Sequence, residues 1–377
     1  MTTYQTSAAK PSFLSAGIIL LLIIAVIGAG AAAWRLIGGL GATTNLSDQV
    51  PWGLWVALDV LTGVALAAGG FTLAAAVHVF NLKEWKPLTR PAVLSAFIGY
   101  LMVCIGLLLD IGKPQAFWHP LVMWQPHSML FEVICCTMTY TAVLAVEFKP
   151  TFLEGIGWTR LAKMMQAKAV VIPLAILAAT LSFFHQSSLG GLFLLMKGRL
   201  NDLWWTTMLP WNFLLSAVAV GLAMTSVEAI LSGWALKHPV SLKLLRQLAK
   251  GTAYALAVYA AVRLLDLLLK GNIGLALAGD QASKHFLLEV AGGALLPMLL
   301  LFTLARNEGS ILFAQLLVIA GVVLNRFNVL WLTQLEGSKT YLPSVTELAV
   351  SLGLIAGAIL LFKAAAVYLP VFTPAKS

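Results

Sequence analysis

The sequence predicts an all-α integral membrane protein with about ten transmembrane helices. Of its 377 residues, 60% are hydrophobic and only 10% are charged, and the mean hydropathy is +0.91. A soluble protein carries about 25% charged residues, so this chain has too few polar side chains to cover a water-facing surface. The net charge of +9 does not indicate a nucleic-acid partner, because the basic residues lie in short loops between apolar segments.

Ten apolar runs are long enough to cross a bilayer, which takes roughly 20 residues of helix. The loops between them are short, so no soluble domain is left over. The first run lacks a small-residue cleavage site and is therefore expected to be a retained helix. The runs cover residues 13–34, 52–80, 91–110, 128–148, 166–188, 208–236, 250–270, 285–305, 310–333 and 346–369.

The basic residues predict the orientation of the chain. The flanks on the side of both termini carry 14 Lys and Arg residues, and the opposite flanks carry 7. Basic loops stay in the cytoplasm, so both termini are expected there, in the inner membrane of a bacterium. The larger set is Lys10, Lys83, Lys86, Arg90, Lys149, Arg160, Lys163, Lys168, Lys237, Lys243, Arg246, Lys250, Arg306 and Lys376. The smaller set is Arg35, Lys113, Lys197, Arg199, Lys270, Lys284 and Lys339.

Four ionisable residues are predicted to lie in the outer half of the membrane, each on a different helix. Asp59 lies roughly 10 Å below the outer surface and Glu132 roughly 6 Å below it. His185 is near the outer end of the fifth helix, and Asp110 closes the third at a similar level. A charge near the centre of a membrane helix costs at least ~2.5 kcal/mol. This group has three carboxylates and no evident cationic partner, so we expect it to be functional.

A second group of charges lies in helices seven to nine. Arg263 and Asp266 are three residues apart, so they share one helix face. Glu289 enters the eighth helix from the outer side, and Arg326 lies near the outer end of the ninth. Two arginines and two carboxylates favour a buried ion-pair network with a structural role.

The inner half of the membrane holds fewer charges. Glu147, Glu228 and Lys363 lie near the inner ends of their helices, from which they are expected to reach the interface. The alternative is that they are steps on a proton path.

The cysteines and histidines argue against a bound metal group. The three cysteines lie within apolar runs and include no CxxC motif, so the chain is expected to hold no iron–sulfur cluster and no metal. A membrane b-type cytochrome uses two histidines on facing helices for each haem. Of the six histidines only His185 is clearly intramembrane, so no haem is expected.

Four short segments resemble signatures of the NrfD/PsrC family. Together with the stretch at 341–344 they extend over nearly the whole chain, and within the family they are most similar to the HybB type, the membrane subunits of periplasm-facing [NiFe] hydrogenases. The segments are Pro51-Trp52-Gly53-Leu54-Trp55-Val56-Ala57-Leu58-Asp59, Leu130-Phe131-Glu132, Phe184-His185-Gln186-Ser187-Ser188-Leu189-Gly190 and Leu277-Ala278-Gly279-Asp280.

The resemblance implies a haem-free, quinone-reactive subunit that is not catalytic alone. A ferredoxin-like iron–sulfur subunit would dock on the outer side and pass electrons from hydrogenase small and large subunits to a quinone, menaquinone being favoured, with proton translocation left open. The family's acidic and histidine site residues carry over to Asp59, Glu132 and His185. Asp110 is a weaker candidate for proton transfer, since it is expected near solvent.

The resemblance also implies a division into two four-helix bundles, helices two to five and six to nine, with one flanking helix at each end of the chain. The segments are then a first flanking helix and outer loop (1–50), a first bundle with the quinone site (51–200), a second bundle (201–335), and a last flanking helix with a tail (336–377).

Two other functions suit the same sequence. An ion-coupled secondary transporter would favour helices broken near the midplane, and Pro173 and Pro297 mark candidate breaks. A purely structural membrane anchor would tether an outer enzyme, but it would leave the buried carboxylates without a use.

Overall fold

The computed structural model describes residues 15–236, 239–332 and 341–372. Within these ranges every regular element is a helix, and ten helices are long and apolar enough to cross a membrane. Each corresponds to one of the ten predicted runs, so the predicted all-α membrane fold is confirmed. Lys10, Lys237, Lys339 and Lys376, which entered the orientation count, lie outside the described residues.

The ten crossings are named by their position along the chain. Several contain π-helical turns, so one crossing can hold more than one element. In order they are α1 (Ala16–Gly38); η1 (Trp55–Thr62) with α3 (Gly63–Leu66), α4 (Gly69–Ala74) and η2 (Ala75–Val79); η3 (Lys83–Leu88) with α5 (Thr89–Asp110); α7 (Met129–Gly155); α9 (Lys168–Leu192) with η5 (Phe193–Met196); α10 (Leu209–Leu236); α11 (Leu242–Leu269); α13 (Gln281–Leu287) with η6 (Leu288–Leu295) and α14 (Leu296–Thr303); α15 (Glu308–Phe327) with η7 (Asn328–Leu332); and α16 (Val345–Tyr368). Short connecting helices are α2 (Leu40–Thr43), η4 (Pro114–Ala116), α6 (His119–Val122), α8 (Thr159–Met165) and α12 (Ile273–Ala276).

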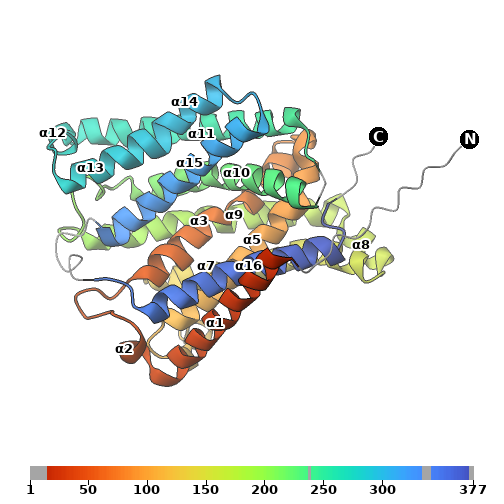
Figure 1. Ribbon diagram of the computed structural model, residues 1–377, viewed down its shortest axis with the longest axis horizontal. Coiled ribbons are helices and arrows are strands. Elements are labelled where there is room, and N and C mark those ends of the chain that lie inside the picture. Colours follow the sequence, from red (N-terminus) through yellow and green to blue (C-terminus); the bar gives the residue numbers. More distant parts are fainter. Residues whose placement is uncertain (1–14, 237–238, 333–340, 373–377) are drawn as a thin grey trace, which may run out of the picture.

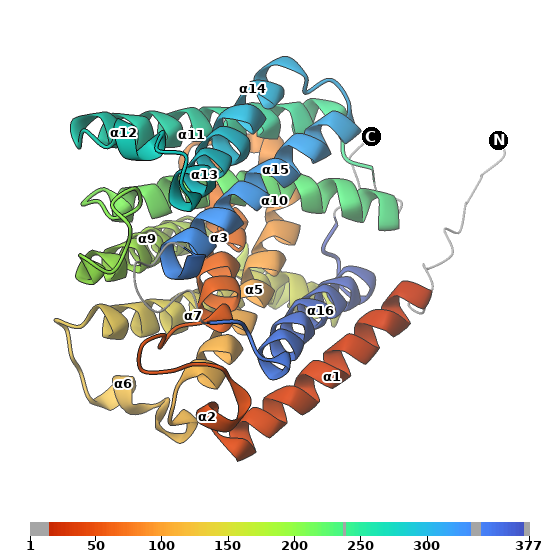
Figure 2. The same cartoon turned by 60° about the vertical axis from the view of Figure 1, so that its left-hand side comes forward.

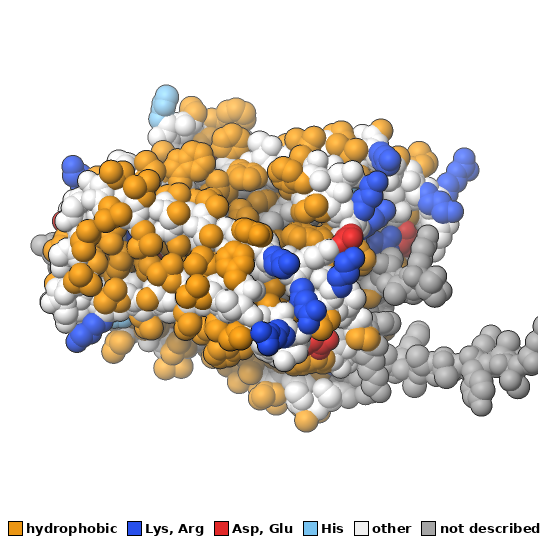
Figure 3. Space-filling view, turned by 90° about the horizontal axis from the view of Figure 1, so that it is seen from above, with side chains coloured by type: hydrophobic (Ala, Val, Ile, Leu, Met, Phe, Trp, Pro, Cys, Tyr) orange, Lys and Arg blue, Asp and Glu red, His pale blue; other side chains and the backbone are white. Residues whose placement is uncertain are grey.

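The bundle has two unlike ends. At one end, the termini end, the described chain begins before α1 and finishes after α16, and α8 lies there too (Figure 1). The opposite end, the loop end, carries the connections that contain α2, α6 and α12 (Figures 1 and 2). On the face seen in Figure 3, Lys and Arg side chains gather toward the termini end, beside a broad apolar surface. This is the charge asymmetry that orients membrane proteins.

Arg35 corrects one detail of the orientation count. From the sequence it was expected in an outer flank, but it lies within α1 and is only 1% exposed. It is therefore a buried charge at membrane depth, and such a side chain needs partners from neighbouring helices.

The second crossing and α10 form the centre of the molecule. Their membrane-spanning windows are 83% and 72% buried, more than those of the other candidate spans. The second crossing contacts α5 and α9, which both flank α7, while α10 contacts α11 and α15, which both flank the eighth crossing. Two four-helix groups joined along the second crossing and α10 are our interpretation of these contacts.

The first and last crossings lie side by side against the first group of helices (Figures 1 and 2). Gly28 of α1 and Gly353 of α16 allow this approach, because a Cβ on Gly353 would lie 2.6 Å from the Cα of Gly28. Small residues at such crossings let two backbones touch within a membrane.

The prolines do not break their helices. α9 continues through Pro173, and Pro297 lies within α14, which follows directly on η6. The irregular crossing is instead the second, where a turn at Ala67 and Ala68 separates α3 from α4. Gly221 of α10 packs there, and a Cβ on it would lie 2.7 Å from the carbonyl carbon of Ala68.

The contact between the eighth and ninth crossings can be tested with neighbouring glycines. A Cβ on Gly293 would lie 2.4 Å from the Cα of Gly321, so Gly293→Ala should lower the free energy of unfolding in detergent by about 1–3 kcal/mol. Gly292→Ala is the matched control, since its Cβ would make an ordinary 3.4 Å contact with Leu288. Equal unfolding curves for the two variants would contradict this packing.

Candidate functional site

Asp59 lies in the first π-helical turns of the second crossing and faces two other helices. Its side chain is 8% exposed, and its Oδ2 accepts a 2.6 Å hydrogen bond from the Ser351 hydroxyl of α16. On the α5 side Gly106 makes room for it, because a Cβ there would lie 3.1 Å from the Cβ of Asp59. The site thus depends on a flanking helix that comes almost 300 residues later in the chain.

Asp110 and Arg35 lie close to Asp59. Arg35 donates from Nε to the Leu109 carbonyl at 2.8 Å and from Nη2 to the Ile111 carbonyl at 2.9 Å, so it closes the C-terminus of α5. Asp110 lies between these two residues, half-buried, within electrostatic range of both Arg35 and Asp59. The sequence did not indicate this nearby cation, although an Arg35–Asp110 ion pair is not among the described contacts.

Glu347 joins the same region to the first of the family-like segments. It is completely buried and accepts hydrogen bonds from the Tyr341 hydroxyl and from the backbone of Asn45 and Ser344. Tyr341 in turn accepts from the backbone N–H of Leu54 at 2.8 Å. Gly53 is required for this contact, because a Cβ on it would overlap the Tyr341 ring.

Glu132 lies on the first turn of α7 and contacts α9. Its Oε1 accepts a 2.5 Å hydrogen bond from the hydroxyl of Ser188. Ser188 is three residues after His185 on α9, so the two side chains share one face of that helix. Glu132 is half-buried, whereas His185 is fully enclosed.

His185 lies beside two tyrosines deep in the bundle. The rings of His185 and Tyr100 are 5.7 Å apart, and those of Tyr100 and Tyr140 are 4.6 Å apart, edge to face. Both tyrosine hydroxyls lie near Ser182, one turn before His185 on α9. Within the described residues both ring nitrogens of His185 are buried without a hydrogen-bond partner, whereas the Ser182 hydroxyl lies within reach of both tyrosine hydroxyls. Leaving such a group unpaired costs about 1–3 kcal/mol, so this spot is typical of a binding site for a polar ligand or water.

The four predicted residues therefore form two clusters. The aspartate cluster contains Asp59 and Asp110 with Arg35, Glu347 and Ser351. The histidine cluster contains Glu132 and His185, joined through Ser188, with Tyr100, Tyr140 and Ser182. Both lie toward the loop end of the first group of helices, and both contact α5.

Three residues of the second charge group share one network. Glu289 accepts from Trp204 Nε1 at 2.7 Å, Asn328 Nδ2 at 2.8 Å and Asn325 Nδ2 at 2.7 Å. Its Oε1 is 3.9 Å from Nη2 of Arg263. Arg326 reaches it through Asn325, to whose Oδ1 it donates at 2.6 Å. The charges are well partnered, which suits a structural role.

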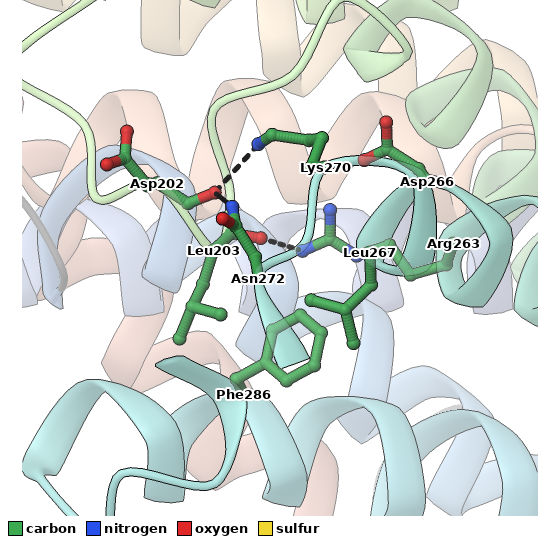
Figure 4. A pocket seen from close by; sticks show the side chains of 8 residues that line it. All are labelled: Asp202, Leu203, Arg263, Asp266, Leu267, Lys270, Asn272 and Phe286. Atoms are coloured by element: carbon green, nitrogen blue, oxygen red, sulfur yellow. Dashed lines mark hydrogen bonds between the residues drawn. The ribbon is translucent and has the colours of Figure 1, made fainter. Parts of the chain in front are cut away.

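Asp266 lies outside this network. Its Oδ1 accepts from the Thr206 hydroxyl at 2.7 Å. It lines a shallow pocket at the loop end, drawn in Figure 4, into which the Arg263 guanidinium also projects. Lys270 closes one side by donating to the Asp202 carbonyl at 2.9 Å, and burial lowers the pKa of its ammonium group. An Asp266–arginine ion pair, part of the expected network, is not among the described contacts.

Several residues of these clusters did not stand out in the sequence. Tyr100, Tyr140 and Ser182 lie in apolar runs where aromatic and small residues are ordinary core positions. Arg35 and Glu347 lie close to predicted helix ends, where charges are common. The Tyr341–Ser344 stretch was the one available signal for Glu347, because its Ser344 opens α16 through a capping box with that residue.

The clusters suit proton transfer more than metal binding. Among the described residues no group of three His, Cys, Asp or Glu side chains could hold a metal ion. The histidine cluster offers one imidazole and two phenol groups as hydrogen-bond donors or acceptors, next to a carboxyl group. Such groups can hold a polar ring substituent and move protons to it.

Residues 42–336 match the family described as "Polysulphide reductase, NrfD". The chain belongs to the NrfD family. The matched region includes the helices that carry the histidine cluster, Asp59 and Asp110, whereas α1 and α16 lie outside it. The predicted family resemblance is confirmed.

Three relatives are similar along almost the whole chain. The chain is 32% identical to the "Probable Ni/Fe-hydrogenase 2 b-type cytochrome subunit" of Escherichia coli, with 91% of this chain and 88% of that protein covered. It is 30% identical to the "Menaquinone reductase, integral membrane subunit" of Nitratidesulfovibrio vulgaris, with 90% and 88% covered. It is 26% identical to a selenate reductase subunit of Mesobacillus selenatarsenatis, with 94% of each covered.

The structural role of the second charge group can be tested at Glu289. Glu289→Gln should lower the free energy of unfolding by about 3 kcal/mol or more, because it leaves Arg263 buried without its carboxylate. Glu308→Gln is the matched control, since Glu308 also accepts an indole N–H, from Trp234, but at an exposed position. Thermal unfolding of both variants in detergent measures the difference. An unchanged Tm for Glu289→Gln would argue against a structural network.

Proposed function

We propose that this chain is a haem-free, quinone-reactive membrane subunit of an oxidoreductase complex. The observation that carries the proposal is the histidine cluster, where an enclosed histidine with two unpaired ring nitrogens lies beside two buried tyrosines in a member of the NrfD family. A quinone presents two ring oxygens that accept hydrogen bonds, so its head group matches these donors. The aspartate cluster lies at the same end of the bundle and supplies further titratable groups.

The names of the relatives support a more specific proposal. One is named as a hydrogenase subunit and another as a menaquinone reductase subunit. We therefore assign the chain to a [NiFe] hydrogenase type of complex, with menaquinone as its substrate. Its partners would be hydrogenase small and large subunits and a ferredoxin-like iron–sulfur subunit, which would dock on the loop end close to both clusters.

This site would support the reduction of a quinone to a quinol, which takes up two electrons and two protons. The electrons would come from the iron–sulfur partner, because no cysteine set of the chain can hold a cluster. His185 would hydrogen-bond one ring oxygen, and Glu132 would supply a proton through Ser188. Asp59 and Asp110 would exchange protons in the neighbouring cluster. Enclosure in a dry bundle strengthens each of these interactions.

The haem-free part of the proposal departs from the "b-type cytochrome" wording in the name of one relative. His185 is packed against Tyr100 and not against another histidine. His78 ends the second crossing at the termini end, while His119, His127 and His285 lie in or beside loop-end helices. These positions do not offer two histidines on facing helices at one depth.

The loop end is proposed to face the periplasm of a bacterium, with both termini in the cytoplasm. The support is the larger number of Lys and Arg residues around the termini end, seen on one face in Figure 3. Protons and electrons for the quinone would then meet near the outer surface of the inner membrane.

The site assignment can be tested in the intact complex. His185→Ala or Asp59→Asn should lower hydrogen-dependent quinone reduction in membranes by about 100-fold or more, since each removes a group that transfers or positions a proton. Reduction of a soluble dye by the catalytic subunits should be unchanged. Ser187→Ala is the control, because the half-buried Ser187 hydroxyl bonds the Phe183 carbonyl of its own helix, on the same turn as His185. Full quinone reduction by both variants would favour a purely structural anchor.

The cofactor assignment has a separate test. The purified complex should show no b-type haem band in its visible spectrum, and lipid extraction should recover menaquinone. The physical reason is that, in the described part of the chain, His185 packs against Tyr100 and faces no second histidine. A haem band in a one-to-one ratio with the chain would overturn the haem-free proposal.

A further inference from the structure

A cavity opens at the termini end of the first group of helices. Its walls come from η2, α5, α7, α8 and α9. The space open to the centre of a water molecule is about 90 Å³, which accommodates several waters. The cavity is thus at the opposite end of the bundle from the aspartate cluster and its Arg35.

Polar groups in this cavity lack partners within the protein. Glu147 of α7 and Thr89 of α5 both line it, and Glu147 Oε2 and Thr89 Oγ1 are buried without a hydrogen-bond partner in the described part of the chain. His78 of η2 lines it as well. These two unpaired polar atoms, around a space of this size, are what a group of bound waters would satisfy.

An anionic lipid headgroup is a poorer occupant than water. The one arginine of the lining, Arg90, already pairs with Glu154 at 2.9 Å and donates to the Pro370 carbonyl at 3.0 Å. A phosphate in the cavity would also lie beside the carboxyl group of Glu147, which no basic side chain pairs at salt-bridge distance in the described residues. Water can form hydrogen bonds with both the Glu147 carboxyl group and the Thr89 hydroxyl group, and it adds no charge to the cavity.

The histidine cluster lies further along α7 and α9, on two of the helices that form the cavity walls. Glu147 and Tyr140 are seven residues apart on α7, so their side chains face the same side, about 10 Å apart along the axis. Glu147 is within electrostatic range of the Tyr140 hydroxyl. From there the hydroxyls of Tyr140, Ser182 and Tyr100 adjoin one another up to His185.

We propose that this cavity is a hydrated proton-uptake site, with Glu147 as its acceptor, that feeds protons from the termini end to the histidine cluster. The inference rests on the proposed quinone chemistry. Each quinone reduced takes two electrons from the iron–sulfur partner and two protons. The protons enter through the cavity water, Glu147 and the Tyr140–Ser182–Tyr100 hydroxyls, and they replace those that His185 and Glu132 give to the quinone. Glu147 is a positioning and relay residue and not a catalytic one, because it does not touch the quinone.

The test uses the intact complex in sealed liposomes with the loop end outward and pyranine trapped inside. During hydrogen-driven reduction of a menaquinone analogue, the lumen should become alkaline for the native complex. Glu147→Gln should lower both lumenal proton uptake and quinone reduction at least about tenfold, and Glu147→Asp should restore most of both. Glu84→Gln is the control, since it removes an exposed carboxylate at the same end.

The outcomes separate the two proposals. If native complex reduces no quinone, the proposed function fails and this inference with it. If native complex reduces quinone but takes up protons only from the loop side, or if Glu147→Gln reduces quinone with unchanged lumenal uptake, the proton-uptake site alone is wrong.

A second measurement does not need turnover. In a background without Cys104, Cys135 and Cys136, Thr151→Cys places a thiol in the cavity wall, and Ala178→Cys places one in the dry core. A membrane-impermeant thiosulfonate added at the termini end should label the first at least about tenfold faster than the second, because only a hydrated path brings the reagent to it. Equal, slow labelling of both would show a dry cavity and overturn the proposal.

Discussion

An ionisable side chain at membrane depth has to be enclosed and partnered by other helices, and the described structure depends on that constraint. Arg35 of α1 is paired with carbonyls at the end of α5, and Glu289 of η6 with donors from three other segments. Glu347 ties α16 to the segments before the second crossing. Each buried charge therefore fixes the relative position of helices that are far apart in sequence, in a medium where apolar surfaces alone give little specificity.

The same constraint identifies where function is placed. In the second group of helices the carboxylate and guanidinium groups are largely satisfied by neighbouring side chains, which rigidifies that half. Around His185 and Glu147 the polar atoms are buried but unpaired. The unpaired ring nitrogens of His185 and the unpaired carboxylate oxygen of Glu147 are available to a substrate and to water.

Much of the fold could be predicted because a membrane-spanning helix is recognised from the hydropathy and length of a single stretch of sequence. The ten crossings, and the positions of Asp59, Glu132 and His185 along them, follow from counting residues along each run. Which side chains meet does not follow, because it depends on helix neighbours. Ser351 was indistinguishable from an ordinary small residue of a membrane helix until α16 was seen against Asp59. Likewise Asp266 shares a helix face with Arg263, yet Thr206 from a distant loop provides its hydrogen bond.

The pairing of α16 with the aspartate cluster has a consequence for how the protein is made. Helices enter the membrane in the order of synthesis, and α16 follows all the helices that it contacts. Until it is inserted, Asp59 has no hydroxyl donor from Ser351, and Tyr341 and Glu347 are not yet in place around Leu54. The cluster is therefore completed only when α16 is inserted, so that a chain interrupted before α16 carries an unfinished acidic site.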